Sequence, residues 1–284
     1  MGLRRRLRFA LATSGAFGRV VASSPPLRAR AWRSARRYVA GEEIADAIAM
    51  AGRLRTAGLG ASVDLFGERT ARADAEPVAR AHEELCAQLA RATDERAWVS
   101  VDLSHLAFDA ALLDRVAAAV PAGRRLQVGA EEAAVTDRVL DLVVAAARRG
   151  RPVEATLQAN LRRSPGDARR LAAEGVPVRL VKGAYVESPR EALAWGPPTD
   201  AAYAELARAL RNAGADVALA THDAPLREAL LAELPAARCE LLLGLAERDA
   251  LALAAAGRDT RVYVPYGGDW LRYFLRRRAE STGA

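Results

Sequence analysis

Eight short apolar runs recur along the chain after residue 40, and each is followed by a longer segment rich in Ala, Leu, Arg and Glu. Runs of this length are typical of buried strands, whereas the longer segments repeat their apolar residues at the spacing of a helix face. Glycines stand where a helix would end before the next strand, as at Gly150, Gly175, Gly214 and Gly257. The apolar runs occupy residues 61–66, 98–103, 125–130, 153–158, 178–183, 217–221, 239–244 and 261–265.

This alternation predicts an α/β chain that folds as a (β/α)8 TIM-type barrel. Helical segments at 41–57 and further upstream would precede the barrel, and a last helix at 268–280 would follow its eighth strand. A doubly wound open sheet is the alternative, but such a sheet usually carries a glycine fingerprint after its first strand. The stretch FGERTAR at 66–72 is not that fingerprint. The helical segments between the strands include residues 74–91, 108–119, 132–149, 199–213 and 246–256.

The first 37 residues hold much of the formal charge of +7. Arg8 and Arg19 interrupt their apolar stretch, so we expect no secretory signal. The pattern of residues 1–37 instead indicates a basic helical segment that packs on the rest of the protein or lies on an anionic membrane surface. Residues 38–284 would form the barrel, and they carry no basic run interleaved with aromatics, which argues against nucleic-acid binding.

Cysteine and histidine usage indicates neither disulfides nor structural metal. Cys86 and Cys239 lie far apart, and the three histidines have no ligand-like spacing. We therefore predict a cytoplasmic protein without a metal site, with peripheral contact at the inner face of the membrane left open.

Polar residues stand at the carboxyl ends of the predicted strands, where barrel enzymes place their chemistry. They form no metal cluster, Ser/His/Asp set or facing pair of carboxylates. They do include hydrogen-bond donors, and one of them, Lys182, is the only lysine in the chain. Such a set suggests a cofactor that performs the chemistry while the protein orients it. The strand-end residues are Glu68, Asp102, Ala130, Gln158, Lys182, Thr221, His222, Leu242 and Tyr263.

Several motifs together resemble the proline dehydrogenase family. The main matches are RLVKGAY at 179–185, VYVPYG at 262–267 and YFLRRRAE at 273–280. Together with five supporting matches they fall in the family's order from residue 38 to 280, so the resemblance covers most of the chain. The supporting matches are YVAGEEIADAI (38–48), VDLFGE (63–68), LQANL (157–161), ATHD (220–223) and LLLGL (241–245).

The resemblance implies an FAD-dependent barrel enzyme whose last helix lies over the barrel mouth. It implies hydride transfer from C5 of L-proline to flavin N5, giving 1-pyrroline-5-carboxylate, with the electrons passed to a quinone. Arg179 and Lys182 take the catalytic positions. Cofactor contacts fall on Ala130, Gln158, Arg179, Lys182, Gly183, Ala184, Thr221 and His222. Substrate contacts fall on Arg276, Arg277, Glu280, Tyr185, Leu242, Tyr263 and Tyr273, with Glu68 pairing one of the two arginines.

Two positions depart from the family pattern. On the second strand the family usually reads S-x-K-L-S, whereas this chain reads VSVDLS, which places Asp102 where the family has a lysine. On the third strand the family's D-x-E becomes VGAEE, which places Gly129 where the family has that lysine's aspartate partner. Losing both members of an ion pair is physically more reasonable than leaving one buried charge alone. Asp102 would then lie beside the substrate, free to pair with Arg276 or Arg277.

Three functions are compatible with this sequence. The first is proline oxidation in a rearranged pocket, and the second is the same flavin chemistry on a different cyclic amino acid or amine. The third is a flavin-binding homologue without activity.

Overall fold

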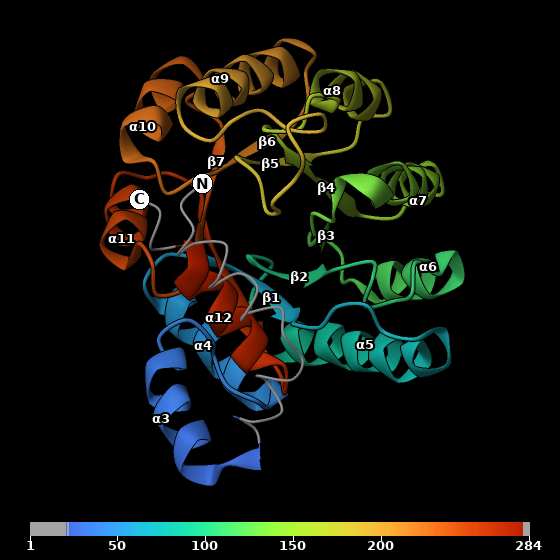
Figure 1. The fold of residues 1–284 in the computed structure, drawn as a ribbon, viewed down its shortest axis with the longest axis vertical. Coiled ribbons are helices and arrows are strands. Elements are labelled where there is room, and N and C mark those ends of the chain that lie inside the picture. The colour runs from blue at the N-terminus through green and yellow to red at the C-terminus, as the bar shows by residue number, and fades with distance from the viewer. Residues whose placement is uncertain (1–20, 22, 281–284) are drawn as a thin grey trace.

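The computed structural model of the chain describes residue 21 and residues 23–280, apart from the side chains of residues 278–280. Eight parallel strands close into a barrel in sequence order (Figure 1). The predicted (β/α)8 barrel is therefore confirmed, and the doubly wound sheet is excluded. The strands are β1 (Gly60–Leu65), β2 (Ala97–Val101), β3 (Leu126–Val128), β4 (Val153–Gln158), β5 (Val178–Val181), β6 (Val217–Ala220), β7 (Arg238–Leu242) and β8 (Thr260–Tyr266).

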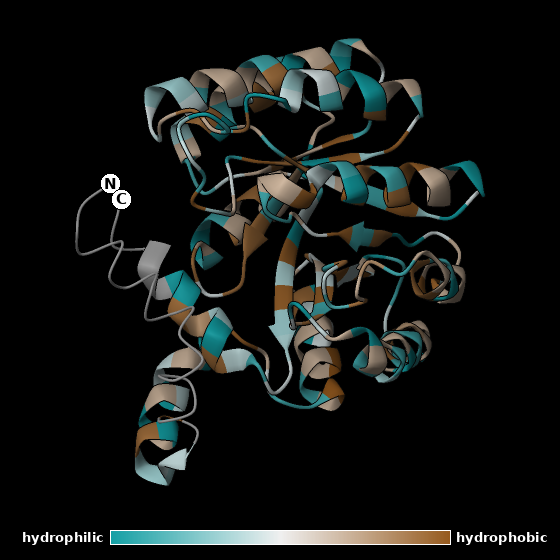
Figure 2. Ribbon diagram, turned by 45° about the vertical axis from the view of Figure 1, so that its right-hand side comes forward, coloured by the Kyte–Doolittle hydropathy of each residue, from teal (hydrophilic) through white to brown (hydrophobic). Residues whose placement is uncertain are grey.

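Amphipathic helices surround the barrel as an outer ring (Figure 1). Each turns its apolar side to the strands, so hydrophilic and hydrophobic residues are interleaved along every helix (Figure 2). Single-turn 3₁₀ helices at Arg72–Asp74 and Ala133–Val135 precede two of them. The ring comprises α4 (Ile44–Thr56), α5 (Ala75–Ala92), α6 (Ala110–Ala119), α7 (Thr136–Arg148), α8 (Ser164–Ala173), α9 (Pro197–Asn212), α10 (Ala224–Glu233) and α11 (Glu247–Ala255).

The ring is closed by a helix from the start of the chain. Helix α4 packs against both β1 and β8, the place that the helix after the eighth strand takes in a regular barrel. The last helix, α12 (Trp270–Glu280), is thereby released from the ring, and its residues line a cavity at the carboxyl ends of the strands. A last helix over the barrel mouth is what the sequence predicted.

Helix α3 (Pro25–Ala35) supports α12 from outside the barrel. The indole rings of Trp32 and Trp270 meet edge to face with centroids 4.9 Å apart, and Ala35 and Val39 are buried in the same cluster. Part of the predicted basic segment 1–37 is therefore helical and docked. Its residues 1–20 and 22 lie outside the described part of the chain.

The two faces of the barrel strands differ in chemistry. Alternate residues such as Val99, Leu126 and Leu180 are buried beneath the helices. The intervening positions face the barrel interior, and many of them are polar yet buried: Ser62, Asp64, Ser100, Gln127, Glu154, Arg238, Glu240 and Arg261. The interior of a TIM barrel is usually filled by Val, Ile and Leu. A charged interior therefore indicates that these side chains serve more than packing.

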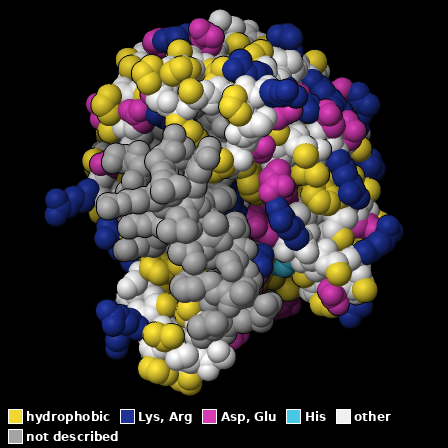
Figure 3. All heavy atoms as spheres, viewed as in Figure 1, with side chains coloured by type: hydrophobic (Ala, Val, Ile, Leu, Met, Phe, Trp, Pro, Cys, Tyr) yellow, Lys and Arg dark blue, Asp and Glu magenta, His cyan; other side chains and the backbone are white. Residues whose placement is uncertain are grey.

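The outer surface mixes both signs of charge (Figure 3). Many of these charges pair between neighbouring helices, as Arg115 does with Glu76 and Glu83 at 2.7 and 3.0 Å. None of the described helices combines the length and the apolar character that a membrane span requires.

Candidate active site

A cavity of about 360 Å³ opens at the carboxyl ends of the strands, under α12. Its volume lies within the range of small-molecule sites. Most of the residues expected to bind cofactor or substrate line it, although they come from positions 102 to 277 of the chain. These are Asp102, Ala130, Arg179, Lys182, Gly183, Ala184, Tyr185, Thr221, His222, Leu242, Tyr263, Tyr273, Arg276 and Arg277.

Arg179 points from β5 into the barrel at the base of this cavity. Its Nε donates to Thr156 Oγ1 at 3.0 Å, and its Nη1 donates to Gln127 Oε1 at 2.9 Å. The side chain is only 11% exposed, so these two bonds hold it in one orientation. Neither Thr156 nor Gln127 was singled out from the sequence. Thr156 lies two residues before the end of β4, and Gln127 lies one residue before the end of β3. Their inward-facing positions close to the strand ends could have identified them from the sequence.

Lys182 lies at the end of β5, and its ammonium group bridges two carboxylates. Its Nζ donates to Asp200 Oδ1 at 2.5 Å and to Asp223 Oδ2 at 2.7 Å. Partial burial opposes the charged form, but the two carboxylates outweigh it, and the pKa of Lys182 is raised. A compact ammonium fits between two carboxylates, and it keeps a positive charge at the cavity wall.

Gln158 supports the cavity wall without lining the cavity. Its Oε1 accepts from the Ala184 N–H at 2.8 Å, and its Nε2 donates to the Glu131 carbonyl at 2.8 Å. The amide thus fixes the backbone of the Gly183–Ala184 turn. A Cβ at Gly183 would overlap the Asn160 side chain, so this close approach requires glycine.

Helix α12 brings two arginines to the cavity. The predicted pairing of Glu68 is present, because Arg276 Nη1 contacts Glu68 Oε1. The Arg276 guanidinium also lies 5.1 Å from the centre of the Tyr185 ring, and Arg277 lies 5.1 Å from that of Tyr273. Both cations are therefore held beside aromatic rings. Glu280 ends α12, but its side chain lies outside the described part of the structure.

Tyr263 and Asp64 form a second pair at the cavity floor. The Tyr263 hydroxyl contacts Asp64 Oδ2. Burial raises the pKa of Asp64 to about 7, although the Tyr263 hydrogen bond and the charge of Arg179 both act to lower it. Asp64 was missed by the sequence analysis, although it stands on an inward-facing position of the first strand within the quoted motif VDLFGE.

Asp102 occupies the space that a side chain at residue 129 would need. A Cβ built on Gly129 would overlap the Asp102 carboxyl group. Burial, together with the nearby Glu131 and Asp64, raises the pKa of Asp102 well above its usual range. The carboxylate that pairs with Arg276 is Glu68, whereas Asp102 lies over Gly129.

His222 and Thr221 follow β6 at the cavity wall. The ring Nε2 of His222 accepts from the Leu242 N–H at 3.3 Å, and Thr221 Oγ1 accepts from the Asp223 N–H at 3.1 Å. Desolvation by the surrounding protein, followed by the charges of Arg277 and Arg227, lowers the pKa of His222 to about 4, although the residue is exposed at the cavity wall. The imidazole is thus neutral at physiological pH.

The wall of the cavity fits a flavin in its chemistry. The redox-active ring of a flavin is flat and presents carbonyl and ring-nitrogen acceptors, and the wall offers Arg179, Lys182 and Thr221 as donors. Among the described residues, no group of His, Cys, Asp and Glu side chains is arranged to hold a metal ion.

The sequence model of the proline dehydrogenase family matches residues 47–284. Proline dehydrogenase 1 of Bacillus subtilis strain 168 is 31% identical over 263 residues, which cover 87% of this chain and 86% of that protein. The proline dehydrogenase of Deinococcus radiodurans is 30% identical over 278 residues, which cover 89% of this chain and 88% of that protein.

Solved structures of proline utilization A proteins have the same fold. That of Bdellovibrio bacteriovorus, inactivated by N-propargylglycine, matches 98% of this chain with a TM-score of 0.83 at 21% identity. A mutant of the Bradyrhizobium japonicum protein matches 94% of this chain with a TM-score of 0.75 at 25% identity. This chain spans 37% and 33% of those two longer chains.

Proposed function

Because the chain belongs to the proline dehydrogenase family, a family of oxidoreductases, we propose that it oxidises L-proline at this cavity with bound FAD. The observation that carries the proposal is the gathering of cationic and aromatic side chains from β5, β8 and α12 around one cavity. FAD would accept the hydride that leaves C5 of the substrate, which yields 1-pyrroline-5-carboxylate. The side chains of the cavity would bind and orient the substrate and the cofactor and neutralise their charges.

The substrate end of the cavity lies under α12. Arg276 and Arg277 suit a carboxylate because guanidinium groups bind carboxylates with charge-assisted hydrogen bonds. Tyr263 and Tyr273, whose ring centroids lie 6.1 Å apart, provide an apolar wall for a saturated ring. We propose that Tyr185 and Leu242 complete this wall, and that Glu280 supports the arginine pair. Glu68 would hold Arg276 in place until substrate binds.

The cofactor end lies over β4 to β6. Arg179 and Lys182 bring positive charge to this end, which stabilises the electron-rich reduced flavin. Ala130, Gly183 and Ala184 would lie against the ring system, with the turn held by Gln158, while Thr221 and His222 offer polar contacts. In this proposal Arg179 and Lys182 are the catalytic residues, since they are the cations placed to stabilise the charge that develops.

We further propose that the barrel, residues 38–284, passes its electrons to a quinone, with the protein in the cytoplasm at the inner membrane face. The support is the charge of the preceding segment 1–37. Its described helix α3 exposes Arg30 and Arg33, and its Leu27 is 48% exposed. Each basic residue near an anionic bilayer contributes about 1 kcal/mol of attraction.

A second candidate is the same chemistry on a different cyclic amino acid or amine. Asp102 favours it, because a partly buried carboxyl group at the cavity stands where the resemblance places a lysine in the family. Such a group donates one hydrogen bond when protonated and attracts a cation when ionised. A substrate bearing an additional polar group near Asp102 would gain from it.

Anaerobic titration of the flavin-reconstituted protein tests both candidates. L-Proline should bleach the flavin absorbance of the holoprotein if it is the substrate. Bleaching by another cyclic amino acid or amine, but not by L-proline, would support the second candidate. A protein that binds no flavin after reconstitution would refute the proposal.

A further inference from the structure

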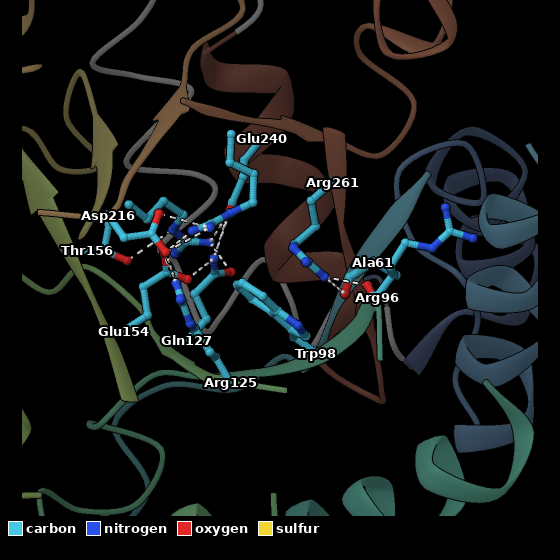
Figure 4. Close-up of polar contacts among 12 residues, drawn as sticks. Ala61, Arg96, Trp98, Arg125, Gln127, Glu154, Thr156, Asp216, Glu240 and Arg261 are labelled. Carbon is cyan, nitrogen blue, oxygen red and sulfur yellow. Dashed lines mark hydrogen bonds and ion pairs between the residues drawn. The ribbon is translucent and has the colours of Figure 1, made fainter. Parts of the chain in front are cut away.

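Beneath the cavity, the barrel interior holds a connected network of buried polar side chains (Figure 4). Arg238 is 6% exposed, and it contacts Glu154 and lies 3.4 Å from Glu240. The network reaches from Trp98, whose ring lies 3.4 Å from the Arg261 guanidinium, up to Arg179. Burial of this many charged side chains is unfavourable unless each one has a partner. Each side chain of the network is therefore held in place by its partners.

Gln127 is the junction between this network and Arg179. Its side chain is fully buried. Its Oε1 accepts from Arg179 Nη1 at 2.9 Å, while its Nε2 lies 2.9 and 2.8 Å from the two carboxylate oxygens of Glu240 and 3.1 Å from Glu154 Oε2. A carboxamide has an acceptor on one side and donors on the other, so it alone satisfies a guanidinium and two carboxylates together.

The bridge keeps the ion pair between Arg179 and Glu240 long, without a hydrogen bond between the two side chains. Arg179 Nη1 lies 3.9 Å from Glu240 Oε2, beyond hydrogen-bond distance. Thr156 Oγ1 accepts from Arg179 Nε, and it donates to the Val128 carbonyl at 2.6 Å. Two fixed acceptors below the guanidinium therefore leave its other N–H groups facing the cavity.

We propose that Gln127 is a positioning residue that holds the positive charge of Arg179 toward the redox cofactor and away from Glu240. This inference rests on the proposed flavin function. Gln127 does not itself line the cavity, so it acts through Arg179. Without the bridging amide, the guanidinium moves toward Glu240, and its charge stabilises the reduced flavin less.

The test is the reduction potential of the flavin bound to Gln127→Leu, measured by equilibration with a reference dye. We expect the equilibrium constant for flavin reduction to fall about tenfold, which is about 30 mV for a two-electron couple. Gln127→Asn serves the same purpose if the leucine variant does not fold. Its amide is one methylene shorter and reaches Arg179 and Glu240 less well, so the potential should again fall.

Glu240→Gln should raise the potential more in the Gln127 variant than in the wild type, because in the variant it also removes the carboxylate toward which Arg179 moves; Glu240 lines the cavity, so its lost charge alone raises the potential equally in both. The matched control is Trp98→Phe, which disturbs the same barrel interior without touching Arg179. It should lower thermal stability and leave the potential unchanged. Folded, flavin-loaded Gln127 variants with the wild-type potential, or an equal fall in Trp98→Phe, would overturn the inference. Failure of the wild-type protein to bind flavin would instead refute the proposed function, so the two failures are distinguishable.

Discussion

The resemblance places Asp102 and Gly129 where the family carries a lysine and its aspartate partner, and restoring that pair is a direct test of the proposed substrate. The perturbation is the double change Asp102→Lys with Gly129→Asp. Sterically the two positions depend on each other, because a Cβ at residue 129 would overlap the Asp102 carboxyl group. Gly129→Asp alone should therefore destabilise the fold by about 1–3 kcal/mol through overpacking.

The magnitude follows from the charge added beside the substrate carboxylate. Replacing Asp102 by lysine adds at least one unit of positive charge at this position, because the new ammonium group is cationic at neutral pH. At ~5 Å and an effective dielectric constant of about 20, one unit contributes roughly 3 kcal/mol before screening. Halving this for solvent screening leaves about 1.5 kcal/mol, or roughly a tenfold gain in kcat/KM for L-proline.

The assay is steady-state oxidation of L-proline by the flavin-loaded wild type, both single variants and the double variant. We expect the double variant to exceed the wild type by up to about tenfold, because the carboxylate added at position 129 offsets part of the lysine's charge. Asp102→Lys alone should gain less, because no carboxylate holds the new ammonium group in place. Thermal melts of all four proteins separate loss of fold from loss of binding. Efficient oxidation of L-proline by the wild type, together with a lower kcat/KM in the double variant, would refute the reasoning.

Three further predictions concern other parts of the site. Arg277→Met should lower kcat/KM by an amount equivalent to about 2–4 kcal/mol, because it removes one of two cations proposed to grip the substrate carboxylate, and unchanged kinetics would exclude that role. The pKa of Asp64 is raised from 3.8 to about 7 by folding, so its contribution to stability is full below about pH 4 and is lost as the pH rises through 7, by up to about 4 kcal/mol. Melting temperatures between pH 4 and 8 should show this decline in the wild type and a shallower one in Asp64→Asn, whereas parallel curves would contradict it. Trp32→Ala removes the edge-to-face contact with Trp270, so it should loosen α12 and raise KM for substrate more than it lowers kcat, with Leu27→Ala on the exposed face of α3 as the control that should change neither.

Helix α3, the described helix of the basic segment 1–37, contributes to the site by packing against α12. Because Trp32 and Ala35 pack against α12, the helix that carries Arg276, α3 contributes to the shape of the cavity as well as to surface charge. A membrane role for its arginines remains a separate proposal, since the exposed side of α3 and its buried side are different surfaces of one helix.

The strand-and-helix pattern predicted the barrel, and the family resemblance predicted most of the cavity lining. A repeated strand-and-helix pattern admits few topologies, and parallel strands that close in order bring all their carboxyl ends to one mouth. Residues as distant as Ala130, Lys182 and Tyr263 could therefore be assigned to one site from their strand ends alone. Their places in the cavity agree with that assignment.

Which polar side chains of the site contact one another could be seen only in the folded structure. That Lys182 bridges Asp200 and Asp223 depends on the path of the loop after β5, because strand periodicity does not fix a loop. That Gln127 reaches Glu240 depends on contact across the barrel, between strands four places apart in the sheet. The alternation of residues along a strand predicts which face of that strand each side chain occupies. Which side chains meet across a closed barrel depends in addition on how all eight strands are shifted relative to one another.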